Sequence, residues 1–586
     1  MLGSARFALK EKGKNKYDFM SSSALALGAA LWRSCCSGER NENAKEVRKM
    51  RTRVIGPPGT GKTSWAIRKV AEFIKAGYDP GSIVATTFTR SGRRAIKEKV
   101  RAILRSEGLL KGKAEDRWIG RTIHSICKEL LGIPSKSVMD WKHLKDFADA
   151  YRYKLSLLES HSYDVDGEFR DVMLETADDY YLFFVDWWRH RMYPKPELAY
   201  PDFMKRFWKS LPGGFDKQRL MLFLKRYDEY KRENGLWDFA DFLVGALRER
   251  ACPEGIKILF CDEAQDLSPL LLNVTVMWES RAERSFYIGD PNQAIYGFMG
   301  GDHKLLAEMP CEEEIQLVRS NRVPRAVWEK DKRLLERFGL WYREDYLPRN
   351  EEGYVVRGRA PSWRELPFQG KKVFVMHRTR MLAREWGDML IEMGIPFKAL
   401  RGRQSPLDRE EVKVVGLLER LAKGEAVTIQ EMAELVADTS YIPSALYLER
   451  GAKTRMKRLA EQDPERPVTK HDLPELGFNM RFMAKFTEGK LFSLLKLDER
   501  EREYLIRAYR KYASVLGKVE IYNGTIHAFK GEECDIAVIN PDLTKRTADG
   551  LVTSPQEEAK VFHTALTRAR EGVYILYPQR GMGFPI

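Results

Sequence analysis

A stretch near the start of the chain combines glycines with a lysine and a hydroxyl residue at a spacing suited to phosphate. Residues 56–63 read GPPGTGKT and fit the pattern G-x-x-x-x-G-K-[ST]. Glycines let the backbone turn tightly, so that several N–H groups face one anion. A helix that begins at about Lys62 adds the field of its N-terminal dipole. The Lys62 ammonium would reach the β- and γ-phosphates of a nucleotide, and the Thr63 hydroxyl would ligate Mg²⁺.

The flanks of this stretch favour a nucleotide site over the alternative, a glycine-rich turn with an incidental lysine. The apolar pair Val54 and Ile55 precedes it as the end of a buried strand, and a helical run follows it. The predicted nucleotide-binding residues are Gly56, Pro57, Pro58, Gly59, Thr60, Gly61, Lys62, Thr63 and Ser64.

Two carboxylates follow another apolar run, IKILFC at 256–261, which predicts a strand inside a parallel sheet. Asp262 would hold Mg²⁺ directly or through water, and Glu263 would orient and deprotonate the attacking water, which indicates hydrolysis rather than binding alone. Gln293 follows a further strand, SFYIG at 285–289, on a loop from which it could sense the γ-phosphate. The alternative is an acidic pair that caps a strand and a solvated glutamine.

Composition sets the broad class of the protein. At 586 residues with 43% hydrophobic content, the chain is long enough for several domains with real cores. Its net charge of +16 suggests a polyanionic partner, either nucleic acid or an acidic membrane surface. Seven scattered cysteines with no C-x-x-C pair predict reduced thiols in a cytosol-like, cytoplasmic compartment, and no zinc site or transmembrane helix is expected.

Strand and helix patterns alternate along most of the chain. Strands are predicted at 82–88, 372–376, 397–400, 519–523, 536–539 and 573–577, and helices at 89–104, 381–393 and about 556–570. Residues 119–131 are predicted to form a short strand followed by a helix. Two charged, helical stretches interrupt this alternation, at about 128–252 and 403–518. In the first stretch, Tyr180, Trp187 and Trp188 are predicted to pack in a core rather than to form a ligand cage.

The predicted fold class is therefore α/β, with two parallel-sheet lobes that each carry a mainly helical insertion. The predicted limits are 1–50 for a poorly defined basic segment, 51–127 with 253–315 for the first lobe, 128–252 for its insertion, 316–402 with 519–586 for the second lobe, and 403–518 for its insertion.

Ten motifs in series resemble those of the UvrD/Rep/PcrA-like DNA helicases of superfamily 1. GPPGTGKT matches the first motif, DEAQD the second, GTIHAFKGEECD the fifth and FHTALTRAREGVYIL the sixth. ATTFTRSGRRAIKEKV, RTIHSICKELL, GLWDFADFLVGAL, GDPNQAIYGFMGGD, SNRVPRAV and HRTRMLAREWGDMLIEMGIPFKAL resemble elements that lie between them. The resemblance covers nearly all of residues 54–586 in the family order.

The resemblance implies two RecA-like lobes with ATP in the cleft between them. Arg322 and Arg568 align with arginines of the second lobe that reach the γ-phosphate, and Glu533 aligns with a glutamate that contacts the nucleotide sugar. Together with Lys62, Glu263 and Gln293, these two arginines complete the expected catalytic set. ATP and Mg²⁺ are the implied cofactors.

The resemblance also implies a DNA track across both lobes, opposite the cleft. The expected DNA-binding residues are Phe88, Thr89, Thr122, His124, Tyr296, Phe298, Arg380, Thr525 and His527. For the aromatic members, ordinary core packing is the alternative to stacking on bases. The expected partners are single-stranded DNA and its junctions with duplex DNA, bound by a monomer or weak dimer.

Three functions are compatible with these residues. The leading hypothesis is an ATP-dependent DNA helicase or translocase that moves 3′→5′ by family resemblance. An RNA-directed helicase and a DNA-binding regulatory factor with a vestigial ATPase are the alternatives, and the complete set of chemical residues argues against the second of these.

Overall fold

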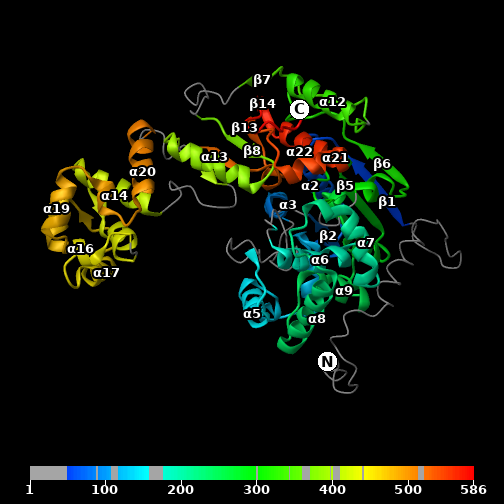
Figure 1. The fold of residues 1–586 in the computed structure, drawn as a ribbon, viewed down its shortest axis with the longest axis horizontal. Coiled ribbons are helices and arrows are strands. Elements are labelled where there is room, and N and C mark those ends of the chain that lie inside the picture. The colour runs from blue at the N-terminus through cyan, green and yellow to red at the C-terminus, as the bar shows by residue number, and fades with distance from the viewer. Residues whose placement is uncertain are drawn as a thin grey trace.

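The chain folds around two parallel sheets (Figure 1). The computed structural model describes residues 49–87, 90–106, 108, 117–156, 174, 176–297, 301, 303–341, 343–358, 370–395, 397–399, 410–438, 441–512 and 520–586. Each sheet has six strands, in the order β3-β2-β4-β5-β1-β6 for the first and β7-β14-β13-β8-β12-β9 for the second. This topology confirms the predicted α/β class with two RecA-like lobes.

The first sheet contains the strands β1 (Met50–Ile55), β2 (Ile83–Thr86), β3 (Ile119–Arg121), β4 (Ile258–Asp262), β5 (Arg284–Gly289) and β6 (Glu313–Gln316). Its accompanying helices are α2 (Lys62–Lys75), α3 (Arg90–Ser106), α4 (Ile123–Leu130), α10 (Pro269–Glu279) and α11 (His303–Ala307). All residues of β2 and β4 are buried, as expected for parallel strands with both faces covered. As predicted, α2 begins at Lys62.

The second sheet contains β7 (Tyr354–Gly358), β8 (Val373–His377), β9 (Lys398–Ala399), β12 (Ile521–Thr525), β13 (Cys534–Ile539) and β14 (Ala569–Leu576). Its helices are α12 (Arg325–Arg337), α13 (Arg380–Glu392), α21 (Lys545–Thr553) and α22 (Pro555–Leu566). The predicted helix at 556–570 is wrong at its end, because Ala569 already pairs with Cys534 as the first residue of β14. Arg568 therefore lies in the turn between α22 and β14.

A helical insertion separates β3 and α4 from β4. Its helices are α5 (Trp141–Tyr151), α6 (Ala177–His190), α7 (Pro196–Phe207), α8 (Lys217–Asn234) and α9 (Phe239–Arg248). Tyr180, Trp187 and Trp188 are buried in its aromatic core, which confirms their predicted packing role. A buried ionic cluster also joins α6, α8 and α9: Arg189 and Lys231 both donate hydrogen bonds to Asp238 and Asp241.

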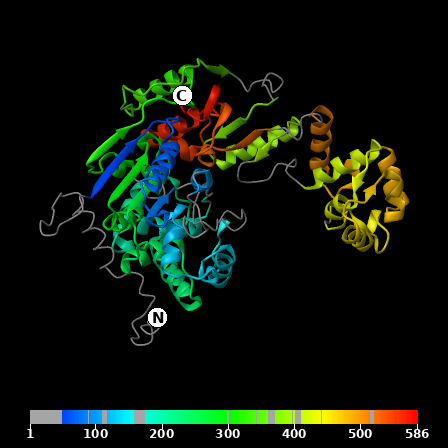
Figure 2. The same ribbon diagram turned by 180° about the vertical axis from the view of Figure 1, so that it is seen from behind.

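The second insertion has a hydrophobic core of its own and stands apart from the two sheets in both views (Figures 1 and 2). It contains α14 (Glu410–Ala422), α15 (Ile429–Met432), α16 (Ser444–Tyr447), α17 (Ala452–Gln462), α18 (Leu473–Leu476), α19 (Met480–Thr487), α20 (Glu499–Tyr512) and the antiparallel pair β10 (Val427–Thr428) and β11 (Pro467–Val468). Within the described ranges, no helix combines the length and apolar composition that a bilayer crossing requires.

Candidate active site

The predicted phosphate loop connects β1 to α2. Gly59 and Gly61 have φ of 76° and 82°, which favours glycine at both positions. Gly61 is the N-cap of α2, and no side chain of the described residues caps that end of the helix. The first amides of α2 therefore face the loop without a side-chain acceptor, as an anion site requires.

The side chain of Lys62 folds back over this loop. Its Nζ donates to the carbonyl oxygen of Gly56 at 2.6 Å and lies 3.4 Å from that of Pro57. Burial lowers the pKa of Lys62, while Asp290 and Glu263 nearby oppose that shift. The ammonium is therefore held at the loop by acceptors that a phosphate group could replace.

Thr63 and Asp262, the two residues predicted to hold Mg²⁺, contact each other. The Thr63 hydroxyl donates to Asp262 Oδ2 at 2.8 Å, and Asp262 Oδ1 is buried with no hydrogen-bond partner among the described residues. Burial and the neighbouring Glu263 raise the pKa of Asp262 to about 7. A divalent cation would satisfy the orphaned oxygen and stabilise the carboxylate, so these residues fit Mg²⁺. No described group of three or more His, Cys, Asp or Glu side chains could hold a metal alone, so the cation would need nucleotide phosphates as further ligands.

Glu263 follows β4 in a left-handed conformation, with φ of 58°, which is uncommon for a residue with a side chain. Its carboxylate accepts a hydrogen bond from Gln265 Nε2. Burial opposes ionisation of Glu263, but Lys530 and Lys62 outweigh it and lower the pKa. The side chain is therefore an ionised acceptor at the mouth of the sheet, which is the state that a general base needs.

Gln293 lies where the two lobes meet. Its Nε2 donates to Asp290 Oδ2 at 2.8 Å, and its Oε1 accepts from Arg568 Nη2 at 3.3 Å. Arg568 is buried, and burial together with nearby Arg322 lowers its pKa to about 9. Carboxylates partly offset that effect, since Glu263 raises the same pKa.

The segment that leaves the first sheet after β6 packs directly on the phosphate loop. Ser320 Oγ donates to the Pro58 carbonyl at 2.9 Å, and the Asn321 amide donates to the Gly59 carbonyl at 2.8 Å. A Cβ at Gly59 would lie 2.4 Å from Ser320 Oγ and 2.6 Å from Arg322 Cβ. Gly59 is thus needed for this approach as well as for its backbone conformation.

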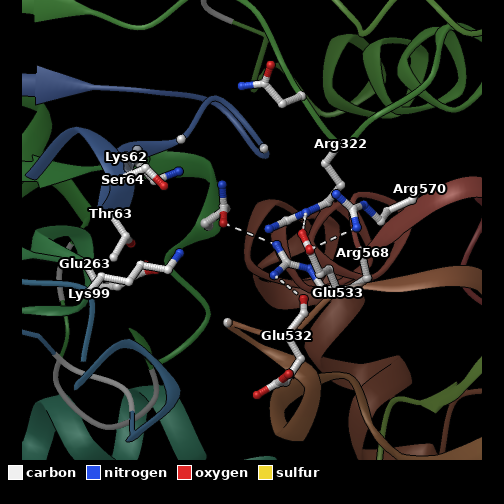
Figure 3. A pocket seen from close by; sticks show the side chains of 15 residues that line it. Lys62, Thr63, Ser64, Lys99, Glu263, Arg322, Glu532, Glu533, Arg568 and Arg570 are labelled. Carbon is white, nitrogen blue, oxygen red and sulfur yellow. Dashed lines mark hydrogen bonds and ion pairs between the residues drawn. The ribbon is translucent and has the colours of Figure 1, made fainter. Parts of the chain in front are cut away.

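These groups surround one pocket of about 400 Å³ (Figure 3). Lys62, Thr63, Glu263 and Lys99 lie on one side, and the second lobe's arginines lie opposite them. The lining residues are Gly59, Gly61, Lys62, Thr63, Ser64, Lys99, Glu263, Gln293, Asn321, Arg322, Gly531, Glu532, Glu533, Arg568 and Arg570. The structure therefore brings all five predicted catalytic residues to one cavity.

Glu533 lines this pocket but has protein partners of its own. Arg322 Nε donates to Glu533 Oε2 at 3.0 Å, and Arg570 lies 3.5 Å from Oε1. Burial opposes ionisation of Glu533, but Arg322 and Arg570 outweigh it and lower the pKa. Its predicted contact with a nucleotide sugar stays a prediction.

Four of the nine predicted DNA-binding residues sit at matching places in the two lobes. Thr122 follows β3 and caps α4 by accepting from the Ser125 amide, and Thr525 ends β12 and accepts from the Ala528 amide. His124 and His527 come two residues after these threonines. The equivalent ends of parallel strands thus carry a Thr-Ile-His element in each lobe.

The remaining predicted DNA residues are placed less uniformly. Tyr296 is only 2% exposed and its hydroxyl donates to the His527 carbonyl at 3.4 Å, so its ring lies between the lobes rather than on the surface. Arg380 begins α13 and is half-buried. Phe88, Thr89 and Phe298 lie outside the described residues. The DNA roles of all nine residues stay predictions.

Sequence reasoning missed several residues at the junction of the lobes. Lys530 donates to the Gln293 carbonyl at 2.7 Å and forms a buried ion pair with Asp266, and Lys99 and Arg570 line the pocket. Lys530 lies within GTIHAFKGEECD, the segment that matches the fifth motif of the family, and this match could have identified the residue. Nothing in the sequence distinguishes Lys99 from the other lysines of its basic helix.

One pocket is lined by the phosphate loop, the carboxylate Glu263 and arginines of the second lobe. These features define the class of P-loop proteins built from two RecA-like lobes. Residues 38–312 match the family model of the UvrD/REP helicase N-terminal domain. The chain therefore carries this domain and is a distant homologue of the UvrD-like DNA helicases, which confirms the resemblance found in its motifs.

Three relatives show how low the sequence identity to this chain is. The chain is 24% identical over 270 residues to a probable DNA helicase of Mycoplasma pneumoniae (42% of this chain, 45% of the relative). It is 23% identical over 396 residues to the ATP-dependent DNA helicase PcrA of Bacillus subtilis (61% and 49%). It is 21% identical over 619 residues to the putative ATP-dependent DNA helicase YjcD of the same species (90% and 77%). The chain thus spans less than half the length of the first two relatives.

Proposed function

We propose that this protein is an ATP-dependent DNA helicase that moves 3′→5′ along single-stranded DNA and unwinds duplex ahead of it. The observation that carries the proposal is the pocket in which Lys62 and Glu263 of one lobe face Arg322 and Arg568 of the other. The relatives described as DNA helicases support the choice of reaction and substrate. The lobe and insertion limits predicted above form part of the proposal.

Each side chain has a role that follows from its place. Lys62 and the amides of the phosphate loop would bind the β- and γ-phosphates, and Thr63 and Asp262 would hold Mg²⁺, which when bound neutralises phosphate charge. Glu263 would take a proton from the attacking water. Gln293 would orient groups at the γ-phosphate.

Arginines from the second lobe would tie hydrolysis to movement. Arg322 and Arg568 belong to the lobe opposite the phosphate loop, so they stabilise transition-state charge only when the cleft is closed around ATP. Hydrolysis removes the group that both lobes bind, and the cleft can open. One cycle of closing and opening would then shift the protein along its DNA track.

The DNA would be bound through its backbone and by stacking, without sequence preference. A net charge of +16 supports a polyanionic partner, and binding should weaken as salt is raised because phosphate neutralisation releases counterions. The proposed contacts are the nine residues named above, in a monomer or weak dimer.

Partial duplexes with a 3′ or a 5′ single-stranded tail test the proposal. We expect unwinding of the 3′-tailed DNA with ATP and Mg²⁺, and none by Lys62→Ala. Unwinding of matched RNA with a better yield than DNA would instead support an RNA-directed helicase. DNA binding with no DNA-stimulated ATP hydrolysis by the wild-type protein would contradict the proposal and favour a regulatory DNA-binding factor.

A further inference from the structure

A histidine in α22 lies at the junction of the lobes without lining the pocket. His563 is 1% exposed, and its Nδ1 lies 2.7 Å from Oδ1 of Asp331 on α12. Its Nε2 lies 3.9 Å from Oδ2 of Asp290, at the end of β5 in the first lobe. Among the described residues, His563 Nε2 and Asp331 Oδ2 have no hydrogen-bond partner. The imidazole therefore lies between one carboxylate from each lobe.

The groups around His563 favour its protonated form. Burial opposes the charge, but Asp331 and Asp290 outweigh it and raise the pKa of His563 to about 9. Lys62 and His563 both contribute to lowering the pKa of Asp290 against its burial, so Asp290 is ionised. Burial, Asp331 and Asp290 raise the pKa of Tyr346, whose hydroxyl donates to the Pro58 carbonyl at 3.1 Å. On α22 itself, Lys560 pairs with Glu557.

Asp290 connects this histidine to the pocket. The same Oδ2 atom that faces His563 accepts the hydrogen bond from Gln293 Nε2 at 2.8 Å, and Gln293 Oε1 in turn accepts from Arg568 at 3.3 Å. His563 lies in the last turn of α22, and Arg568 follows five residues later in the turn before β14. The second lobe thus approaches one loop of the first lobe at two points. Arg568 forms a hydrogen bond with Gln293, whereas the 3.9 Å between His563 Nε2 and Asp290 Oδ2 is about 1 Å longer than a hydrogen bond.

We infer that protonated His563 is a positioning residue, which completes an Asp331–His563–Asp290 link when the cleft closes and thereby holds Gln293 and Arg568 in line with the terminal phosphate. This inference rests on the proposed ATP hydrolysis for its effect on rate, but the position of His563 between the two carboxylates, and with it the raised pKa of the imidazole, is a property of the nucleotide-free protein. It predicts that the link and the rate are lost together as His563 loses its proton.

Two measurements test it. Nuclear magnetic resonance of the protein with isotope-labelled histidine gives the pKa of His563, with the signal assigned by its loss in His563→Asn. Steady-state kinetics give kcat and KM for ATP hydrolysis with single-stranded DNA across the same pH range. His471→Asn is the matched control, because His471 is exposed in the second insertion.

We expect the His563 signal to titrate near pH 9, in keeping with its pKa of about 9, and Asp331→Asn and Asp290→Asn each to lower that pKa. His563→Asn should lower kcat about ten- to a hundredfold with KM changed less than about threefold, since a hydrogen bond to a charged group is lost outside the pocket. Because the pKa of Arg568 is also about 9, the loss of kcat near pH 9 should be smaller in His563→Asn than in the wild type rather than absent. Asp331→Asn, which keeps the imidazole, should move that loss to lower pH. The double variant His563→Asn/Asp290→Asn should have a kcat no lower than that of Asp290→Asn alone.

Other outcomes overturn the inference. An ordinary pKa of about 6.5 for His563, or wild-type kcat in His563→Asn, contradicts it. A kcat in the double variant that is lowered by the product of the two single-variant effects also contradicts it. Should the wild-type protein hydrolyse no ATP, the proposed function fails, and the titration of His563 in the Asp290→Asn variant still decides whether the link exists.

Discussion

Arg568 of the second lobe donates a hydrogen bond of 3.3 Å to Gln293 of the first lobe. Both side chains line the pocket that also contains Lys62 and Thr63. The arginine and the phosphate loop therefore belong to one site even though they come from different sheets. This relationship would make the proposed hydrolysis of a bound triphosphate sensitive to how the lobes are placed.

Replacing Arg568 should lower the rate of ATP hydrolysis far more than it weakens nucleotide binding. Arg568→Ala removes a cation that matters most in the transition state, so we expect kcat for ATP hydrolysis to fall roughly 10³–10⁵-fold. A fluorescent ATP analogue should still bind. Arg333→Ala, at an exposed position on α12, is the control and should keep the wild-type rate. A rate loss under tenfold in Arg568→Ala would argue against a direct role.

Glu263→Gln should separate nucleotide binding from turnover. The amide keeps the shape of the side chain but cannot take a proton from water, so we expect bound ATP with a kcat lowered about 10²–10⁴-fold. Binding is followed by fluorescence and turnover by phosphate release. Glu254→Gln, at an exposed site before β4, serves as the matched control. Hydrolysis at the wild-type rate by Glu263→Gln would show that the base lies elsewhere.

The hydroxyl of Thr63 should set the magnesium requirement. It donates to Asp262 at 2.8 Å, the place where a cation would lie between them. Thr63→Ala should raise the Mg²⁺ concentration for half-maximal ATP hydrolysis by about tenfold or more, whereas Thr63→Ser, which retains the hydroxyl, should stay close to wild type. An unchanged Mg²⁺ titration in Thr63→Ala would remove this residue from the proposed metal site.

The stability of the second lobe should fall at high pH through His563. Its pKa of about 9 in the folded protein lies above the unfolded value of about 6.5. The contribution to stability is therefore complete below about pH 6.5 and is lost as pH rises through about 9, up to roughly 3 kcal/mol. Urea unfolding midpoints measured at pH 7 and above should show this loss in the wild type. A parallel loss in His563→Asn would assign it to other groups.

Arg189 should affect the stability of the first insertion rather than the rate of ATP hydrolysis. It donates to buried Asp238 and Asp241, and Arg189→Met would leave these carboxylates with Lys231 as their main cation. Breaking a buried pair from one side costs about 3–5 kcal/mol, which should appear as an earlier tryptophan-fluorescence transition in urea. Arg232→Met, on the exposed face of α8, should unfold like the wild type. An unshifted transition in Arg189→Met would mean that the cluster contributes little.

Strongly apolar strands were predictable, and polar edge strands were not. β4 ends at Asp262, the first carboxylate after the predicted strand, and β5 ends at Gly289, the predicted end of its strand. Both ends were predictable because an apolar run bounded by polar residues is a clear local signal. β6 reads Glu-Glu-Ile-Gln, with three of its four residues exposed, and it forms a strand because β1 offers it an open edge. β7 likewise exists through its pairing with β14.

Local residue patterns were enough to predict the chemistry of the site, because the phosphate loop, the acidic pair, the glutamine and the arginines all lie in motifs. The order of those motifs also predicted two RecA-like lobes. Only the folded protein shows that Lys530 and His563 are buried between those lobes, that Arg568 donates to Gln293, and that Tyr296 is buried. The physical reason is that motif spacing reflects local backbone geometry. Burial and charge pairing instead arise from segments more than two hundred residues apart that meet only when both sheets have formed, as the separation of 264 residues between Asp266 and Lys530 illustrates.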